Sequence, residues 1–127
     1  MMTPYTTWHV LVVEDEYDSL QMVSKILSYH GITVVVAKNG RECLERLEEF
    51  EPTIIITDLA MPGMDGWQTL AAIRANPATQ HIPVVAMTAY GSVDVAEDAQ
   101  KAGFDAYFPK PVDPRSFVQS LANIISA

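Results

Sequence analysis

Residues 9–16 read HVLVVEDE, so a largely apolar run passes directly into three acidic residues. An apolar run that is continuous rather than alternating is typical of a strand covered on both faces of a sheet. Four more apolar runs follow along the chain. The five predicted strands are His9–Val13, Thr33–Ala37, Thr53–Thr57, Pro83–Thr88 and Ala106–Phe108.

The segments between these runs carry helical apolar spacing or helix caps. In the first segment Leu20, Val23 and Leu27 share one helical face, and Gly31 follows them. The predicted caps and stops of the later helices are Asn39 with Glu42, Asp65 with Gln68, Ser92 with Gly103, and Asp113 with Pro114. Five strand–helix units in so short a chain predict an α/β fold, a parallel sheet with helices on both faces.

Length and composition exclude several classes of protein. The chain has 127 residues, which at about 150 residues per domain indicates one domain, and 49% hydrophobic residues make it globular rather than disordered. Its net charge of −8 argues against nonspecific nucleic-acid binding, because that binding requires Lys and Arg to neutralise phosphates. The single cysteine, Cys43, excludes an intrachain disulfide and a thiolate zinc site.

The amino-terminal residues, MMTPYTTW, have neither the basic nor the apolar segment of a signal peptide. No apolar run approaches the roughly 20 residues that cross a bilayer. We therefore expect a cytoplasmic protein, with a loose tail over residues 1–7 and the domain over residues 8–127.

Polar residues stand at the carboxyl ends of the predicted strands, where ligands bind in an open parallel sheet. They are Glu14, Asp15 and Glu16 after the first strand, Asp58 after the third, Thr88 at the end of the fourth and Lys110 after the fifth. Crowded carboxylates repel one another, and a hard divalent cation such as Mg²⁺ relieves that repulsion. One carboxylate can then attack a phosphoryl group whose oxygens the hydroxyl and the ammonium stabilise. The pattern favours a Mg²⁺-dependent phosphoryl site.

Four short motifs, in order, carry a resemblance to a known family. They are VVEDE at 12–16, DLAMPGMDG at 58–66, MTA at 87–89 and PKP at 109–111. With this spacing the chain resembles the receiver domain of two-component response regulators, of the chemotaxis-regulator type, from His9 to about Ile125. The resemblance implies a doubly wound, flavodoxin-like sheet of strand order 2-1-3-4-5 with five helices.

The resemblance also implies a role for each polar residue. Asp58 is the implied phosphoacceptor, Thr88 the switch hydroxyl and Lys110 the cation that pairs with the phosphate. Tyr107 matches the aromatic residue that turns inward on activation, and Lys110–Pro111 matches a cis peptide bond. The implied ligands of Mg²⁺, with Mn²⁺ as an alternative ion, are Glu14, Asp15, Asp58 and the backbone carbonyl of Ala60.

The function implied is a phosphorylation-controlled switch, not an enzyme that acts on other molecules. A histidine kinase or histidine phosphotransfer protein would donate the phosphoryl group to Asp58. The surface of the fourth helix, fifth strand and fifth helix would then change for a downstream protein target, with no direct contact to nucleic acid or membrane. Related receivers often pair when phosphorylated. The sequence leaves open whether this chain pairs, and whether it is a free-standing regulator, a relay intermediate or a receiver cut from a longer protein.

Two positions tune the phosphoryl lifetime in this family, the second after the phosphoacceptor and the second after the switch hydroxyl. Here they are Ala60 and Tyr90. Ala60 has no polar side chain to orient an attacking water, and Tyr90 can crowd its approach. We therefore predict slow self-dephosphorylation.

The main alternative is a Mg²⁺-dependent phosphohydrolase with an aspartyl nucleophile. Such enzymes require a second acid two residues after the nucleophile, where this chain has Ala60. A flavin-binding electron carrier of the same fold would require a hydroxyl-rich phosphate loop where the acidic residues 14–16 stand. Among the three acidic residues 14–16, we expect Glu16 to be a solvated carboxylate in a first helical turn. Trp67 lies either near the site or in a partner contact.

Overall fold

Strands and helices alternate throughout the computed structural model, which describes residues 5–89 and 93–126. The elements of this part of the chain are β1 (His9–Val13), α1 (Tyr17–Tyr29), β2 (Thr33–Ala37), α2 (Gly40–Glu49), β3 (Ile54–Asp58), α3 (Gly66–Ala75), β4 (Val84–Thr88), α4 (Val93–Ala102), β5 (Ala106–Pro109) and α5 (Phe117–Ile125).

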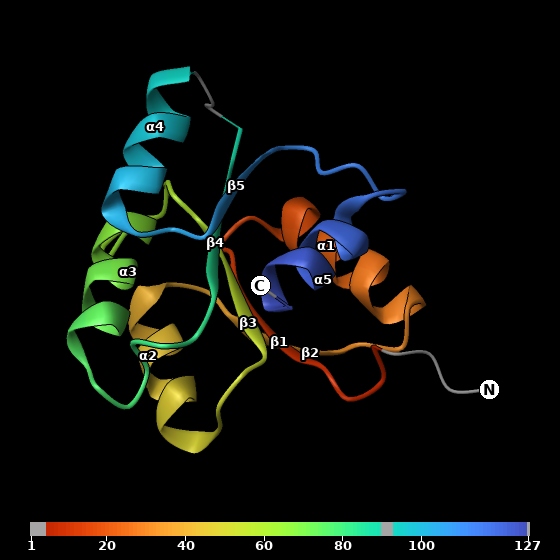
Figure 1. The fold of residues 1–127 in the computed structure, drawn as a ribbon, viewed down its shortest axis with the longest axis horizontal. Coiled ribbons are helices and arrows are strands. Elements are labelled where there is room, and N and C mark those ends of the chain that lie inside the picture. The colour runs from red at the N-terminus through yellow and green to blue at the C-terminus, as the bar shows by residue number, and fades with distance from the viewer. Residues whose placement is uncertain (1–4, 90–92, 127) are drawn as a thin grey trace.

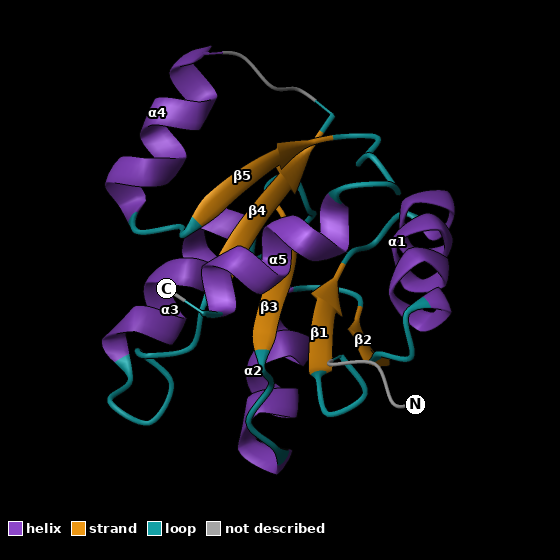
Figure 2. Ribbon diagram, turned by 45° about the vertical axis from the view of Figure 1, so that its right-hand side comes forward, coloured by secondary structure: helices purple, strands orange, loops and turns teal. Residues whose placement is uncertain are grey.

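The strands form one parallel sheet in the order β2-β1-β3-β4-β5, which confirms the predicted α/β fold and strand order. Helices α1 and α5 cover one face, and α2, α3 and α4 cover the other (Figures 1 and 2). Neighbouring residues of β1 supply both layers, since Val10 and Val12 pack toward α1 and α5 whereas Leu11 and Val13 pack toward α2 and α3. Strand order reverses between β1 and β3, so the expected ligand site lies at their carboxyl ends.

The predicted strand bounds are confirmed for β1 and β2 and differ by one residue at one or both ends in the others. Strand β3 begins at Ile54 and continues to Asp58, which pairs in register with Met87. Strand β4 begins after Pro83, because proline has no N–H to donate to the ladder. Asp58 is therefore the last residue of a buried central strand rather than the first residue of a loop.

The predicted helix caps differ in outcome. Asp65 and Gln68 form the reciprocal capping box of α3. At α2 the Asn39 side chain accepts from Glu42 N, but Glu42 Oε1 accepts from Lys38 N instead of Asn39 N, so only half of the predicted box forms. Gly103 ends α4 with a φ of +108°, as predicted, whereas its predicted cap, Ser92, lies outside the described residues.

The predicted start of the last helix is wrong, because α5 begins at Phe117 rather than at Pro114. Asp113 opens a separate turn, in which its Oδ1 accepts from Arg115 N at 2.9 Å and its carbonyl accepts from Phe117 N at 3.0 Å. An Asp side chain that bonds its own downstream backbone competes with helix formation at that point. The predicted apolar face of the helix is retained, with Phe117 and Leu121 buried.

Part of the predicted amino-terminal tail packs on the domain. Residues 5–7 form a turn, and the Tyr5 ring lies 4.9 Å from the Trp8 ring and 5.8 Å from the His30 ring. Among the helices in residues 5–89 and 93–126, none is long and apolar enough to cross a membrane.

Candidate functional site

The site residues come from four neighbouring strands and meet at one edge of the sheet. Glu14 directly follows β1, and Asp58 and Thr88 are the last residues of β3 and β4. Lys110 follows β5, and its backbone N–H donates to the Thr88 carbonyl at 2.9 Å, which fixes the lysine beside β4. The sheet thus brings together residues that lie up to 96 positions apart in the sequence.

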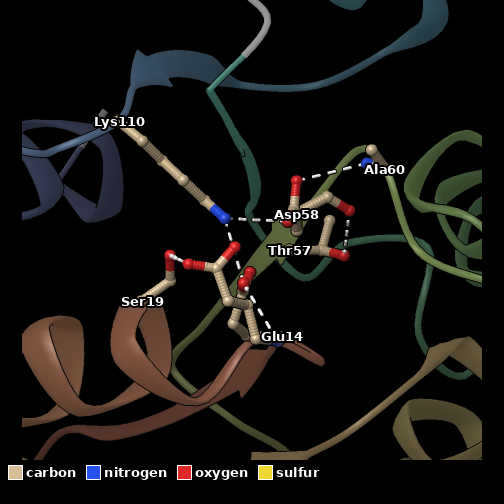
Figure 3. Close-up of polar contacts among 7 residues, drawn as sticks. Glu14, Ser19, Thr57, Asp58, Ala60 and Lys110 are labelled. Carbon is tan, nitrogen blue, oxygen red and sulfur yellow. Dashed lines mark hydrogen bonds and ion pairs between the residues drawn. The ribbon is translucent and has the colours of Figure 1, made fainter.

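The Lys110 ammonium holds two carboxylates together. Its Nζ donates to Asp58 Oδ2 at 2.8 Å and to Glu14 Oε1 at 2.9 Å (Figure 3). The side chains of Glu14 and Asp58 are only 0% and 7% exposed, and that of Lys110 is 11% exposed. Charge-assisted bonds of this length are strong, but two buried negative charges face one positive charge. We call this arrangement the Lys110 clasp.

Glu14 is the electrostatically strained member of the clasp. Its Oε2 is buried and has no hydrogen-bond partner among the described residues. Burial, and then the negative charge of Asp58, raise the pKa of Glu14 to about 7, against the opposing effect of Lys110. Burial lowers the pKa of Lys110, but the hydrogen bonds to Asp58 and Glu14 outweigh it and leave that pKa raised. Lys110 is therefore charged at neutral pH, and the excess charge of the site is negative.

An acidic trio at this edge fits a hard divalent cation. Glu14, Asp15 and Asp58 each offer a carboxylate oxygen, and these three oxygens lie within 4.8 Å of one another. Two members are buried and Asp15 is exposed, so the trio opens to solvent on one side. The unpartnered oxygen of Glu14 supplies one free donor. Oxygen donors in this number suit Mg²⁺, which keeps several waters in its coordination shell.

The structure shows three contacts around Asp58 that the sequence did not predict. Thr57 is fully buried and its Oγ1 donates to the Asp58 carbonyl at 3.0 Å, and the N–H of Ala60 donates to Asp58 Oδ1 at 3.2 Å. Gly66 opens α3 against the same backbone, and a Cβ there would overlap the Asp58 carbonyl. A polar residue inside an apolar strand and a glycine directly after a helix cap are the sequence signals that could have found Thr57 and Gly66.

The remaining predicted switch residues lie near this site. Thr88 is buried at the end of β4, and Tyr107 is half-buried on β5 against the core under α2, α3 and α4. The Lys110–Pro111 peptide bond is cis, as the resemblance implies. Tyr90, which the lifetime prediction uses, lies outside the described residues.

The other candidate residues are not members of the Lys110 clasp. Glu16 is exposed, as expected, but it is the N-cap residue before α1 rather than part of its first turn, and its N–H donates to Glu14 Oε1 at 3.3 Å. Trp67 contacts Phe104 at a ring distance of 5.6 Å, so it joins α3 to the residues after α4. Cys43 is buried, and burial raises the pKa of its thiol to about 12, so it is unreactive at neutral pH.

Comparison with known proteins places the chain among signalling proteins. The family model for the "Response regulator receiver domain" matches residues 10–122. An uncharacterized 14.6 kDa protein of Leptolyngbya boryana is 36% identical over 110 residues, which are 87% of this chain and 84% of that protein. The transcriptional regulatory protein ZraR of Escherichia coli is 40% identical over 105 residues, 82% of this chain but only 23% of the regulator. The chain therefore spans less than a quarter of that regulator's length.

Solved structures agree with this assignment. The chemotaxis protein CheY4 of Vibrio cholerae superposes with a TM-score of 0.85 at 28% identity, over 92% of this chain and 98% of CheY4. The signal receiver domain of a histidine kinase from Syntrophus aciditrophicus has a TM-score of 0.85 at 26% identity, over 94% of this chain and 91% of that one.

Proposed function

This chain belongs to the response regulator receiver domain family, and on that premise we propose that Asp58 is its phosphoacceptor, in a reaction that depends on Mg²⁺. The observation that carries the proposal is the Lys110 clasp, which places one ammonium on the carboxylates of Asp58 and Glu14. A phosphohydrolase is not favoured, because Ala60 offers an N–H to Asp58 and has no side-chain acid.

The proposed reaction is transfer of a phosphoryl group from a phosphohistidine. A carboxylate oxygen of Asp58 attacks phosphorus, an O–P bond forms, the N–P bond to the imidazole breaks, and the imidazole leaves as the product. The Ala60 N–H holds Oδ1 and Lys110 holds Oδ2, so the carboxylate is oriented before the donor arrives. Lys110 then neutralises a phosphoryl oxygen without any large movement, which is the preorganisation that stabilises a transition state.

Glu14, Asp15 and Asp58 are the side chains that we propose as Mg²⁺ ligands, with the backbone carbonyl of Ala60 as a fourth donor. The cation, when bound, offsets the negative charge of the carboxylates and of the incoming phosphoryl oxygens. Support comes from the unpartnered Glu14 Oε2 and from the 4.8 Å spread of the three carboxylate oxygens. Mn²⁺ has the same preference for oxygen ligands and is the alternative ion.

Thr88 and Tyr107 are proposed to convey the change to the α4–β5–α5 surface. Thr88 ends the strand beside Asp58, and its carbonyl accepts a hydrogen bond from Lys110 N. This backbone hydrogen bond connects the two residues that we propose bind the phosphoryl oxygens, Thr88 and Lys110. Tyr107 pairs in register with Ala86 on the same strand, β4. A shift of the Thr88 hydroxyl toward the phosphoryl group would change the space that Tyr107 packs against.

The partners are proposed from family membership. Receiver domains of response regulators take phosphoryl groups from histidine kinases, and we propose a histidine kinase or histidine phosphotransfer protein as the donor here, in the cytoplasm. Beside Lys110 lies a 290 Å³ cavity lined by Ser19, Met22 and Val112, a concave surface next to the site for part of the donor. The output partner is proposed to be a protein rather than nucleic acid, given the charge of −8.

Incubation with acetyl phosphate, with and without Mg²⁺, followed by intact mass measurement tests this proposal. We expect a single phosphoryl adduct that requires Mg²⁺ and that is absent in Asp58→Asn. Asp105→Asn is the matched control, because it removes a carboxylate from the opposite end of the sheet. No adduct in the wild-type chain, or an adduct that persists in Asp58→Asn, would contradict the proposal.

A further inference from the structure

The peptide group that joins Asp58 to Leu59 is hydrogen-bonded at both of its polar atoms. Its carbonyl accepts from Thr57 Oγ1 at 3.0 Å, a bond drawn in Figure 3. Its N–H donates to the Met87 carbonyl of the neighbouring strand β4 at 3.1 Å. A Cβ at Gly66 would overlap the Asp58 carbonyl oxygen and the Cα of Leu59, so α3 packs directly against this peptide. Because a peptide group is planar, these contacts fix the orientation of the whole plane.

The next peptide group, between Leu59 and Ala60, is held in the same way. Its carbonyl accepts from Gly66 N at 3.1 Å, and its N–H donates to Asp58 Oδ1 at 3.2 Å. This N–H orients the Asp58 carboxylate, and the carbonyl of Ala60 is the proposed fourth donor to the cation. The placement of both groups of Ala60 therefore depends on the direction in which the backbone leaves Asp58.

Thr57 supplies one of these four hydrogen bonds, and it does so with its side chain. Met87 and Gly66 take part through backbone atoms, which a change of side chain leaves in place. The fourth bond uses the side chain of Asp58 itself. The Thr57 hydroxyl is therefore the member of the set that can be removed without altering Asp58.

A hydroxyl is unexpected at this position of β3. Thr57 is fully buried, and it pairs in register with Val13 of β1 and Ala86 of β4, two buried members of the apolar layer under α2, α3 and α4. Valine is also branched at Cβ and would avoid the cost of burying a polar group. Within the part of the chain that the structure describes, the Thr57 hydroxyl has one hydrogen bond, to the Asp58 carbonyl. That bond is what distinguishes threonine from valine here.

We propose that Thr57 is a positioning residue, whose hydroxyl fixes the Asp58–Leu59 peptide and thereby holds the N–H of Ala60 on the carboxylate and the carbonyl of Ala60 toward Mg²⁺. This inference rests on the proposed function and deepens it, because Thr57 acts on the site through the backbone. Groups that orient metal ligands contribute to binding without touching the metal, and their loss commonly weakens metal affinity about 10- to 100-fold.

Hydrogen exchange at the Leu59 amide tests the positioning in the unmodified protein without Mg²⁺, because this amide is the N–H of the fixed peptide. Thr57→Val keeps the branched shape but removes the hydroxyl, and it should accelerate this exchange about tenfold. Thr57→Ser keeps the hydroxyl and should restore the wild-type rate. Thr79→Val is the matched control, since Thr79 is also buried and its Oγ1 donates to the Ile73 carbonyl at 2.8 Å, at the opposite end of the sheet. It should leave the Leu59 amide unchanged.

Calorimetric titration with Mg²⁺ completes the test. Thr57→Val should bind Mg²⁺ about tenfold more weakly than the wild type, whereas Thr57→Ser and Thr79→Val should bind it equally well. Adduct formation with acetyl phosphate should follow the same order.

Unchanged Leu59 exchange or unchanged Mg²⁺ affinity in Thr57→Val, or losses that Thr57→Ser shares, would overturn the positioning role. Should Thr57→Val fail to fold, Thr57→Ala, which also lacks the hydroxyl, must show the same losses. A wild-type chain that binds no Mg²⁺ or forms no adduct would contradict the proposed function, whereas the exchange rates of Leu59 in the unmodified variants would still decide on Thr57.

Discussion

Two basic side chains act at opposite ends of the sheet, and they differ in how completely they satisfy their partners. At the carboxyl ends of the strands, Lys110 joins two buried carboxylates and leaves Glu14 Oε2 without a partner. At the amino ends of β4 and β5, both terminal nitrogens of Arg74 donate hydrogen bonds, to three backbone carbonyls and one carboxylate, an arrangement that we call the Arg74 clasp. The Lys110 clasp has spare negative charge and a free oxygen, which suit a cation, and we propose that its Asp58 carboxylate accepts the phosphoryl group. The Arg74 clasp has no such capacity and serves the fold.

The largest expected effect is on the rate of phosphoryl transfer, which should depend on Lys110 and not on Arg74. Lys110→Met should slow formation of the phosphoryl adduct about 100- to 1000-fold, because it removes the cation aimed at the phosphoryl oxygens. Arg74→Met should leave that rate within about twofold, since its bonds lie at the other end of the sheet. Intact mass recorded over time with acetyl phosphate measures both rates. Equal losses in the two variants would show that the clasps do not have separate roles.

The second effect is on the free energy of unfolding, which should depend on the Arg74 clasp. Arg74→Met should lower the free energy of unfolding by about 3 kcal/mol, because three backbone carbonyls, of which that of Ile82 is part-buried, and the Asp105 carboxylate lose a charged donor. Arg46→Met removes an exposed ion pair and one 3.4 Å hydrogen bond to the Val36 carbonyl, and should cost about 1 kcal/mol or less. Urea unfolding followed by circular dichroism measures both values. A loss for Arg74→Met no larger than that for Arg46→Met would refute the structural role of the Arg74 clasp.

The third effect concerns pH. The pKa of Glu14 is raised from 4.5 to about 7 in the folded chain, so between these values the folded state binds more protons than the unfolded state. In the absence of a divalent cation, the free energy of unfolding should therefore fall by up to about 3 kcal/mol as pH rises from 4.5 to 7. Above pH 7, the titration of Glu14 should change the free energy of unfolding little further. Denaturation at several pH values should show this slope in the wild type and its loss in Glu14→Gln. An identical slope in both proteins would contradict the assignment.

The raised pKa of Glu14 also predicts how Mg²⁺ binding depends on pH. Because the cation binds deprotonated carboxylates, Mg²⁺ should raise the melting temperature more at pH 8 than at pH 5.5. A concentration one hundred times the dissociation constant corresponds to about 2.7 kcal/mol of stabilisation. Thermal melts with Mg²⁺ measure the shift, and Asp15→Asn should reduce it without disturbing the Arg74 clasp. A shift that is the same at both pH values would oppose the proposed ligand set.

The smallest effect concerns phosphoryl lifetime. Ala60 holds Asp58 Oδ1 through its backbone N–H only, so its side chain does nothing to orient water. Ala60→Asn supplies a polar side chain at that place and should shorten the half-life of the adduct several-fold. The decay of the intact-mass adduct measures this half-life. A longer half-life in Ala60→Asn would contradict slow self-dephosphorylation as predicted from this position.

The two clasps were not equally predictable from the sequence. Apolar runs fix where strands end, and the carboxyl ends of parallel strands meet, so Glu14, Asp58 and Lys110 could be placed at one edge. The Arg74 clasp could not be predicted, because three of its four partners are backbone carbonyls, which every residue has. Backbone acceptors leave no signal in residue identity.

Local competition explains the errors in the helices. At Asp113 a side-chain bond to Arg115 N forms a turn in place of the predicted first turn of α5. At Asn39 the cap itself is confirmed, but Glu42 bonds one residue further back, to Lys38 N. In both cases two short-range bonds of similar strength were available, and spacing alone does not choose between them.

The central claim is that the Lys110 clasp, and no other carboxylate site, receives the phosphoryl group. Reduction of the acetyl phosphate-treated protein with borohydride converts an aspartyl phosphate to homoserine, which peptide mass spectrometry then locates. We predict conversion at Asp58 alone, dependent on Mg²⁺ and lost in Lys110→Met but retained in Arg74→Met. Conversion at another residue, or at Asp58 with equal yield in Lys110→Met, would contradict the account.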